Sequence, residues 1–149
     1  MSLESFERFR KTGIVKKQKP DISRAKSLIE ESDKRKKFLE NVLDKIGLNE
    51  INANYISEGV YDILIGLIRA KMLVDGFSAS GHSAHAAEIS YMRFMDFSES
   101  EINIMDRLRK FRNKVKYYGK QLTIEYAQNM LKILDKNYER ILGLIKKDI

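Results

Sequence analysis

The strongest chemical signal in the sequence is a run of bases at residues 107–120, RLRKFRNKVKYYGK. It contains no acid and seven bases: Arg107, Arg109, Lys110, Arg112, Lys114, Lys116 and Lys120. The chain has 28 bases and 21 acids, a net charge of +7, so this run alone matches the whole excess. Positive charge concentrated on one segment favours a phosphate-bearing partner. We therefore expect these seven bases to bind a partner's phosphate groups.

The run lies on a predicted helix, residues 99–118, that has two faces. At about 100° per residue, one face is an apolar seam that should pack on the rest of the protein. The seam consists of Ile104, Leu108, Phe111, Val115 and Tyr118. The opposite face carries Arg109, Arg112, Asn113, Lys116 and Tyr117. Like charges at this spacing repel, so we expect a bound anion or a partner's acids to compensate them, the alternative being a solvated basic face.

The elements that position this helix are also predicted to be helices. Only eight glycines and one proline interrupt the chain, and no alternating strand pattern is present. A first helix should follow Pro20 and Asp21 and end at Gly47. A second, the most apolar and therefore central, should begin after Asn52 or Asn54 and end at Gly76. Its apolar face consists of Ile56, Val60, Ile63, Leu64, Leu67, Ile68 and Met72.

The second half of the chain continues in the same way. A short helix, AAEISYMRFM, should follow the loop GFSASGHSAH. Ser98 and Glu101 form a capping box for the basic helix, and Thr123 begins the last helix. We expect an all-α, up-and-down bundle of four to five helices at residues 21–149, preceded by a basic, loosely held arm at residues 1–20.

Composition excludes several classes of protein. The chain has no cysteine, which excludes disulfides, thiolate metal sites and a cysteine nucleophile. No apolar run reaches the ~18 residues that a membrane-spanning helix needs. We expect a soluble cytoplasmic protein without a membrane partner.

The order of these segments resembles the HEPN domain family, helical-bundle proteins of higher eukaryotes and prokaryotes. GIVKKQKPDISRAKSLIEESDKR resembles the lead-in and first helix, and YISEGVYDILIGLIRAKMLVDGFSASGHSAH the second helix with its loop. RKFRNKVKYYG resembles the motif-bearing helix, and IEYAQNMLKILDKNYERIL the closing helix. Many HEPN proteins are metal-independent ribonucleases with an R-x4-6-H motif, and two such motifs face each other across a homodimer cleft.

The resemblance implies a degenerate catalytic motif here. Arg112 matches the arginine that holds the scissile phosphate, and Asn113 matches its polar neighbour. The histidine position falls on Tyr117, Tyr118 or Gly119. Tyrosine, with an ordinary pKa of about 10, is a poor base at neutral pH.

Two histidines offer other chemistry. His82 and His85 form an H-x-x-H pair that could bind a metal ion, and Glu88 is the only possible third ligand nearby in the sequence. We favour a capping or packing role for both histidines and expect no metal or cofactor. Some HEPN toxins are adenylylated on a motif tyrosine, but this chain lacks the H-x-Y motif.

The sequence thus favours a homodimer that binds RNA or nucleotide phosphates, with the ribonuclease residues Arg112, Asn113 and Tyr117 forming a degenerate site. In the dimer, Glu58, Asp62 or Tyr61 of the second helix should offset repulsion between the two basic helices. One alternative is an active, toxin-like endoribonuclease in which Tyr117 or His82 replaces the usual histidine. Another is a structural partner of a separate nucleotidyltransferase, as in a toxin–antitoxin pair.

Overall fold

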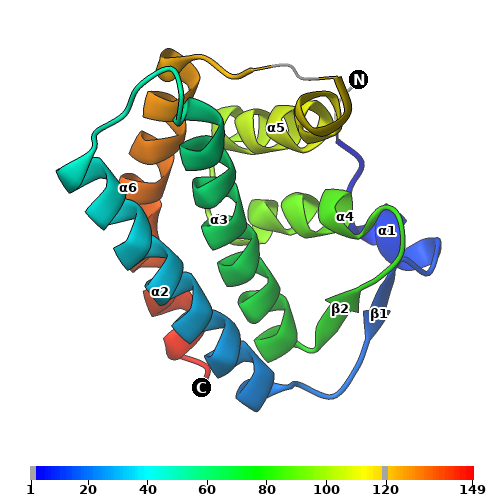
Figure 1. Ribbon diagram of the computed structural model, residues 1–149. Coiled ribbons are helices and arrows are strands. Elements are labelled where there is room, and N and C mark those ends of the chain that lie inside the picture. The colour runs from blue at the N-terminus through cyan, green and yellow to red at the C-terminus, as the bar shows by residue number, and fades with distance from the viewer. Residues whose placement is uncertain (1–2, 119–120) are drawn as a thin grey trace.

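Six α-helices make up most of the chain that the computed structural model describes, residues 3–118 and 121–149, with side chains described outside residues 113–118. They are α1 (Phe6–Lys11), α2 (Ile22–Lys45), α3 (Ala53–Asp75), α4 (Ala84–Ser90), α5 (Glu99–Tyr118) and α6 (Ile124–Lys146). A 3-10 turn, η1 (Tyr91–Phe94), continues α4. The predicted all-α bundle is confirmed (Figure 1). No helix of these described residues is long and apolar enough to cross a membrane.

Two short strands, which no alternating pattern in the sequence marks, accompany the helices. β1 (Val15–Lys17) and β2 (Phe77–Ala79) pair antiparallel, with Val15 opposite Ala79 and Lys17 opposite Phe77. Each strand has three residues, which is too short for a period of two to stand out in the sequence.

The predicted boundaries of the two long helices agree with the structure. The Asp21 carboxylate accepts a hydrogen bond from the Arg24 N–H at 3.0 Å and caps α2. α3 begins after Asn52 and ends at Gly76, which adopts the left-handed conformation with φ of 88°. A Cβ at Gly76 would lie 2.8 Å from the carbonyl oxygen of Gln18, so glycine is needed there for space as well as conformation.

α3 is the central helix, as predicted. α2 and α6 pack on one side of it, and α4 lies on another (Figure 1). All seven residues of its predicted apolar face are buried. Such burial contributes about 1.5–3 kcal/mol per large aliphatic side chain, so α3 supplies much of the stability on which the other helices depend.

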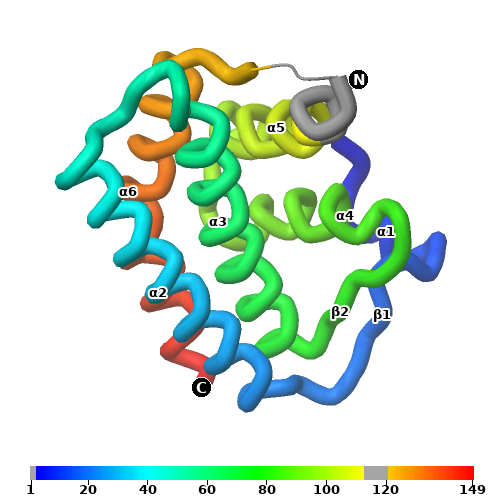
Figure 2. Tube along the Cα trace, in the orientation of Figure 1, coloured from blue at the N-terminus to red at the C-terminus, as the bar shows by residue number. Residues whose placement is uncertain are grey.

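The N-terminal segment is not a loosely held arm, so that prediction is wrong. Phe6 and Phe9 of α1 and Val15 of β1 are buried in the core. The Phe6 ring packs against Phe77 and Tyr91, with centroids 5.3 and 4.7 Å apart. Figure 2 shows the N-terminal part of the trace running beside β2 and α4. The prediction gave weight to the many bases of this segment and too little to its few apolar residues, which pack against the bundle.

The buried face of α5 is rotated from the predicted seam. Ile102, Met105 and Leu108 are fully buried, whereas Ile104 and Phe111 are half-buried. α5 packs against α4 and η1, and it buries the stripe of Ile102 and Met105 rather than the Ile104 stripe. Of the predicted seam, Val115 and Tyr118 lie outside the described side chains.

Candidate phosphate-binding site

The basic helix α5 is fixed at its start by the predicted capping box. The Glu101 N–H donates to the Ser98 hydroxyl at 3.1 Å, and the Ser98 N–H donates to Glu101 Oε1 at 3.0 Å. Glu101 Oε2 also accepts from the buried Asn137 of α6 at 2.7 Å. These bonds anchor the end of α5 that precedes the bases. Asn113, Lys114, Lys116, Tyr117 and Lys120, which the sequence proposed for the site, lie outside the described side chains.

Arg112 is held by acids of its own chain. Its Nη1 lies 3.3 Å from Asp62 Oδ1, and its Nε lies 3.8 Å from Glu58 Oε1. The guanidinium also lies over the Tyr61 ring, 4.9 Å from the centroid. Glu58, Tyr61 and Asp62, which were expected to act in a dimer, thus contact Arg112 from α3 of the same chain.

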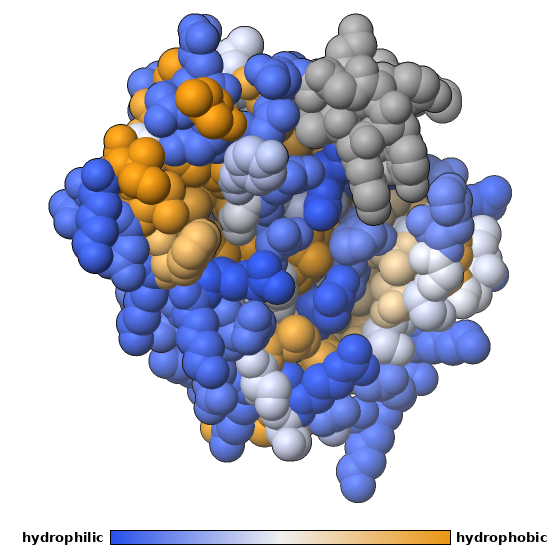
Figure 3. All heavy atoms as spheres, viewed as in Figure 1, coloured by the Kyte–Doolittle hydropathy of each residue, from blue (hydrophilic) through white to orange (hydrophobic). Residues whose placement is uncertain are grey.

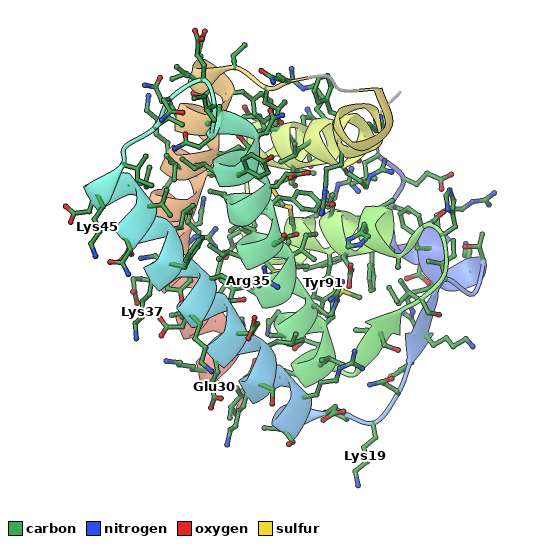
Figure 4. The ribbon with its side chains drawn as sticks, in the orientation of Figure 1. Lys19, Glu30, Arg35, Lys37, Lys45 and Tyr91 are labelled. Atoms are coloured by element: carbon green, nitrogen blue, oxygen red, sulfur yellow. The ribbon has the colours of Figure 1, made fainter. Side chains whose placement is uncertain are left out.

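Asp62 is shared between two arginines. Arg35 reaches from α2 toward α3 (Figure 4), and its Nη1 lies 3.9 Å from Asp62 Oδ2. The acid thereby links α2, α3 and α5 at the surface.

Arg109 and Lys110 share another acid, on α5 itself. Arg109 Nε donates to Asp106 Oδ1 at 2.8 Å, and Lys110 Nζ lies 3.3 Å from Asp106 Oδ2. Asp106 is buried, so this contact is less screened than one between exposed groups. For Arg109 and Arg112 of the predicted basic face, the compensating acids thus come from the same chain, whereas the sequence suggested a bound anion or a partner's acids.

The structure divides the four described bases of the predicted set between two cavities. Arg107 and Lys110 line a cavity of about 440 Å³ with Phe111, Leu122 and Tyr126. Arg109 and Arg112 line a different one, of about 330 Å³. The second cavity, hereafter the arginine–histidine cavity, is lined by Glu58, Tyr61, His82, His85, Ala86, Arg109 and Arg112.

The sequence did not indicate that the two histidines of this cavity lie near its arginines. His82 lies in the loop after β2, and His85 lies in the first turn of α4. The i, i+3 spacing of H-x-x-H indicates that both can face one way, but only the fold shows that Arg109 and Arg112 face them across the cavity. The favoured packing or capping role does not describe two exposed histidines that line a cavity.

His85 is oriented by a buried carboxylate. Its Nδ1 lies 3.5 Å from Glu88 Oε1, and the Glu88 side chain is 1% exposed. Arg69 of α3 donates to both Glu88 oxygens, from Nε at 2.6 Å and from Nη2 at 3.0 Å. The hydrogen bond to Glu88 raises the pKa of Arg69 despite its partial burial. With Nδ1 toward Glu88, the Nε2 edge of the ring points away from this pair.

Tyr61 forms an uncharged wall of the cavity. Burial raises the pKa of its hydroxyl above the ordinary value, and the nearby Arg112 and Arg109 lower it only in part. The ring lies 6.3 Å from the His85 ring and is fully buried. Tyr61 therefore stays protonated at physiological pH and holds Arg112 by a cation–π contact.

The cavity is suited to an anion rather than to a metal. Its lining has two guanidinium groups, one carboxylate and two imidazoles. Within the part of the chain that the structure describes, no three His, Asp or Glu side chains are grouped closely enough to hold a metal ion. Guanidinium groups bind phosphate oxygens through paired hydrogen bonds, and neutral or charged imidazoles can donate to them as well.

Comparison with known proteins gave no match: no protein-family model, curated protein or solved structure matches the chain.

Proposed function

We propose that this protein binds RNA or nucleotide phosphates in the arginine–histidine cavity. The observation that carries the proposal is the meeting of Arg109 and Arg112 with His82 and His85 around one space of about 330 Å³. Pockets that take small ligands begin at about this size. The resemblance to HEPN domains points the same way and is part of the proposal.

Arg112 is the main phosphate ligand in this proposal. Its side chain is 35% exposed, and its ion pairs with Glu58 and Asp62 are long enough for a phosphate oxygen to compete for the guanidinium. The two carboxylates hold the guanidinium in place when the cavity is empty, and they also repel an incoming phosphate.

A homodimer is the second part of the proposal. Its support is a group of exposed apolar side chains near the loop between α2 and α3: Phe38, Ile46, Ile51 and Tyr55. In Figure 3, apolar atoms gather over this corner, at the upper left. Phe38 and Tyr55 line a groove of about 430 Å³ that also contains Glu58, a residue of the arginine–histidine cavity. A second copy seated there would lie next to the phosphate site.

Metal-independent cleavage of RNA is a second candidate function, and the position of the histidines favours it. One imidazole would take the proton of the ribose 2′-OH as its oxygen attacks phosphorus. The other would donate a proton to the departing 5′ oxygen, giving a cyclic phosphate and a free 5′-OH. Arg112 would stabilise the negative charge on the phosphate oxygens. In this version His82 and His85, rather than Tyr117, replace the missing motif histidine.

The test uses short single-stranded RNA in chelator. Arg112→Gln should lower the affinity for a trinucleotide at least about tenfold, because a charged contact to phosphate is lost. Lys132→Gln, an exposed base on α6, is the matched control and should leave the affinity unchanged. Unchanged trinucleotide binding by Arg112→Gln would disprove the proposed site. Cleavage that His82→Ala and His85→Ala each abolish would establish the second function.

A further inference from the structure

A second concentration of positive charge lies at residues 8–26. This segment has one acid, Asp21, and eight bases: Arg8, Arg10, Lys11, Lys16, Lys17, Lys19, Arg24 and Lys26. Its net charge is therefore +7, the same as that of residues 107–120. Because the whole chain also carries +7, the remaining residues together are net negative by the same amount. The positive field of the molecule thus comes from two segments, and we call the eight bases the N-terminal basic surface.

The bases of the N-terminal surface are less neutralised than those of α5. All eight are exposed. Arg8 and Arg10 have long ion pairs, 3.9 Å to Glu4 and 3.5 Å to Glu7. Among the described residues, the other six form no ion pair, whereas Arg109 and Arg112 are both held by acids. Unpaired exposed lysines interact strongly with a polyanion because each can release a counterion from a phosphate.

The small sheet joins this surface to the arginine–histidine cavity. Lys16 of β1 pairs with Ser78 of β2, and the Ser80 N–H donates to the Ile14 carbonyl at 3.1 Å. His82, which lines the cavity, follows Ser80 by two residues. The loop that carries it begins directly after β2, the strand that pairs with β1 (Figure 1). Lys19 points away from the fold just beyond β1 (Figure 4). An RNA strand leaving the cavity past His82 would meet β1 next.

An exposed aromatic ring adjoins the same surface. Phe94 of η1 is 64% exposed, and its ring packs edge-on against Phe6 of α1 with centroids 5.8 Å apart. Tyr91 packs against both rings, with its centroid 5.3 Å from that of Phe94 and 4.7 Å from that of Phe6. A rigid exposed ring beside bases is the combination that binds single-stranded nucleic acid, since unpaired bases stack on the ring while lysines contact the phosphates. Phe94 is a single ring, and among the described residues, residues 8–26 contain no exposed large apolar side chain, so little apolar surface is present here for insertion into a membrane.

We infer that the N-terminal basic surface binds the backbone of single-stranded RNA whose end occupies the arginine–histidine cavity, and that Phe94 stacks on one of its bases. The inference rests on the proposed function, because the cavity supplies the other contact. It extends the binding site from one or two nucleotides to a strand that crosses the sheet.

The experiment compares a trinucleotide with a 20-nucleotide single-stranded RNA on the full chain, by fluorescence anisotropy over a range of salt concentrations. The variant Lys16→Gln/Lys17→Gln/Lys19→Gln should bind the long RNA more weakly. The magnitude of the slope of log affinity against log salt should fall by about two, since each of three lysines that neutralises a phosphate of a single strand contributes about 0.7. The trinucleotide should bind as tightly as before. Lys45→Gln/Lys132→Gln/Lys147→Gln, which removes the same charge elsewhere, is the control and should bind both RNAs almost as the native chain does.

The variant Phe94→Ala tests for base stacking, which RNA provides and a polyanion without bases does not. It should reduce affinity for the long RNA at least about fivefold without changing the salt slope, because stacking involves no counterion. Phe94→Tyr should restore the affinity. Helix content by circular dichroism should be native in every variant, since the changed side chains are exposed.

Several outcomes would overturn the inference. An unchanged salt slope in the Lys16–Lys17–Lys19 variant, or an equal loss in the control variant, would remove the surface from the RNA path. Tight binding to vesicles of anionic phospholipid, with no preference for RNA, would assign the surface to a membrane instead. If trinucleotide binding requires Arg112 but the lysine substitutions leave the affinity for the long RNA unchanged, the inference fails and the proposed function stands. If the trinucleotide does not bind at all, the proposed function fails.

Discussion

Arg112 on α5 and Asp62 on α3 lie 3.3 Å apart and join the basic helix to the central helix of the fold. The pair is partly exposed, with 35% and 37% of the two side chains accessible, so it contributes little to stability. Its consequence is positional, because Asp62 and Glu58 hold the guanidinium beside the arginine–histidine cavity. The same carboxylates oppose the binding of an anion there.

This relationship predicts opposite effects for its two members. Asp62→Asn should raise the affinity for a trinucleotide several-fold, because a negative charge beside the phosphate is removed. Arg112→Gln should lower it. Asp44→Asn, near the C-terminal end of α2, removes the same charge away from the cavity and serves as control. Titration calorimetry at low salt measures all three, and a loss of affinity in Asp62→Asn would show that the acid helps to bind the ligand.

The buried Glu88 carboxylate carries a second prediction. Glu88→Gln should weaken the contacts with Arg69 and His85 and destabilise the protein by about 2 kcal/mol, since hydrogen bonds between charged groups are lost. It should also change the proportion of His85 tautomers, which ¹⁵N chemical shifts of the imidazole report. Glu99→Gln removes an exposed ion pair with Arg93 and should cost less than about 1 kcal/mol. A native tautomer ratio in Glu88→Gln would mean that Glu88 does not orient His85.

The sequence was informative where structure depends on local patterns. Asp21, Gly76, the Ser98–Glu101 box and Thr123 marked helix ends through side-chain and backbone preferences that act within a few residues. The burial of Phe6 and the pairing of β1 with β2 depend on contacts across some 60 residues or more of chain. No short window of sequence contains them.

The same distinction explains what was missed at the candidate site. The bases of α5 stood out because they are neighbours in sequence. Their acids on α3 and the histidines of the β2–α4 segment come from other parts of the chain. Helical periodicity placed Arg109 and Arg112 on one face correctly, but it could not show that Arg107 and Lys110 line another cavity.

A third prediction concerns pH and the start of α5. Burial alone would raise the pKa of Glu101, but hydrogen bonds from Ser98 and Asn137 outweigh it and hold the pKa below the ordinary 4.5. A carboxyl with a lower pKa in the folded state stabilises the fold above its unfolded-state pKa. That contribution is lost as the pH falls through the folded-state value.

The measurement is urea denaturation at pH 7 and at pH 3. Glu101→Gln should be less stable than the native chain at pH 7, and the difference should shrink at pH 3, because the stability contributed by the lowered pKa declines once the pH is below the unfolded-state value. Glu125→Gln, an exposed acid in the first turn of α6, is the control. An equal difference at both pH values would show that the charge of Glu101 does not matter.

The last prediction concerns assembly. Phe38 is 68% exposed and Ile51 85% exposed, and such apolar surface on one corner favours burial against a partner. If that partner is a second copy, sedimentation velocity at micromolar concentration should show a dimer. Phe38→Ser/Ile51→Ser should convert it to a monomer with native helix content, because neither side chain lies in the core. Phe94→Ser removes an equally exposed aromatic ring beside α1 and should leave the dimer intact. A native chain that remains monomeric at ~50 μM would rule out a homodimer of ordinary affinity, since half-association at that concentration corresponds to only about −6 kcal/mol.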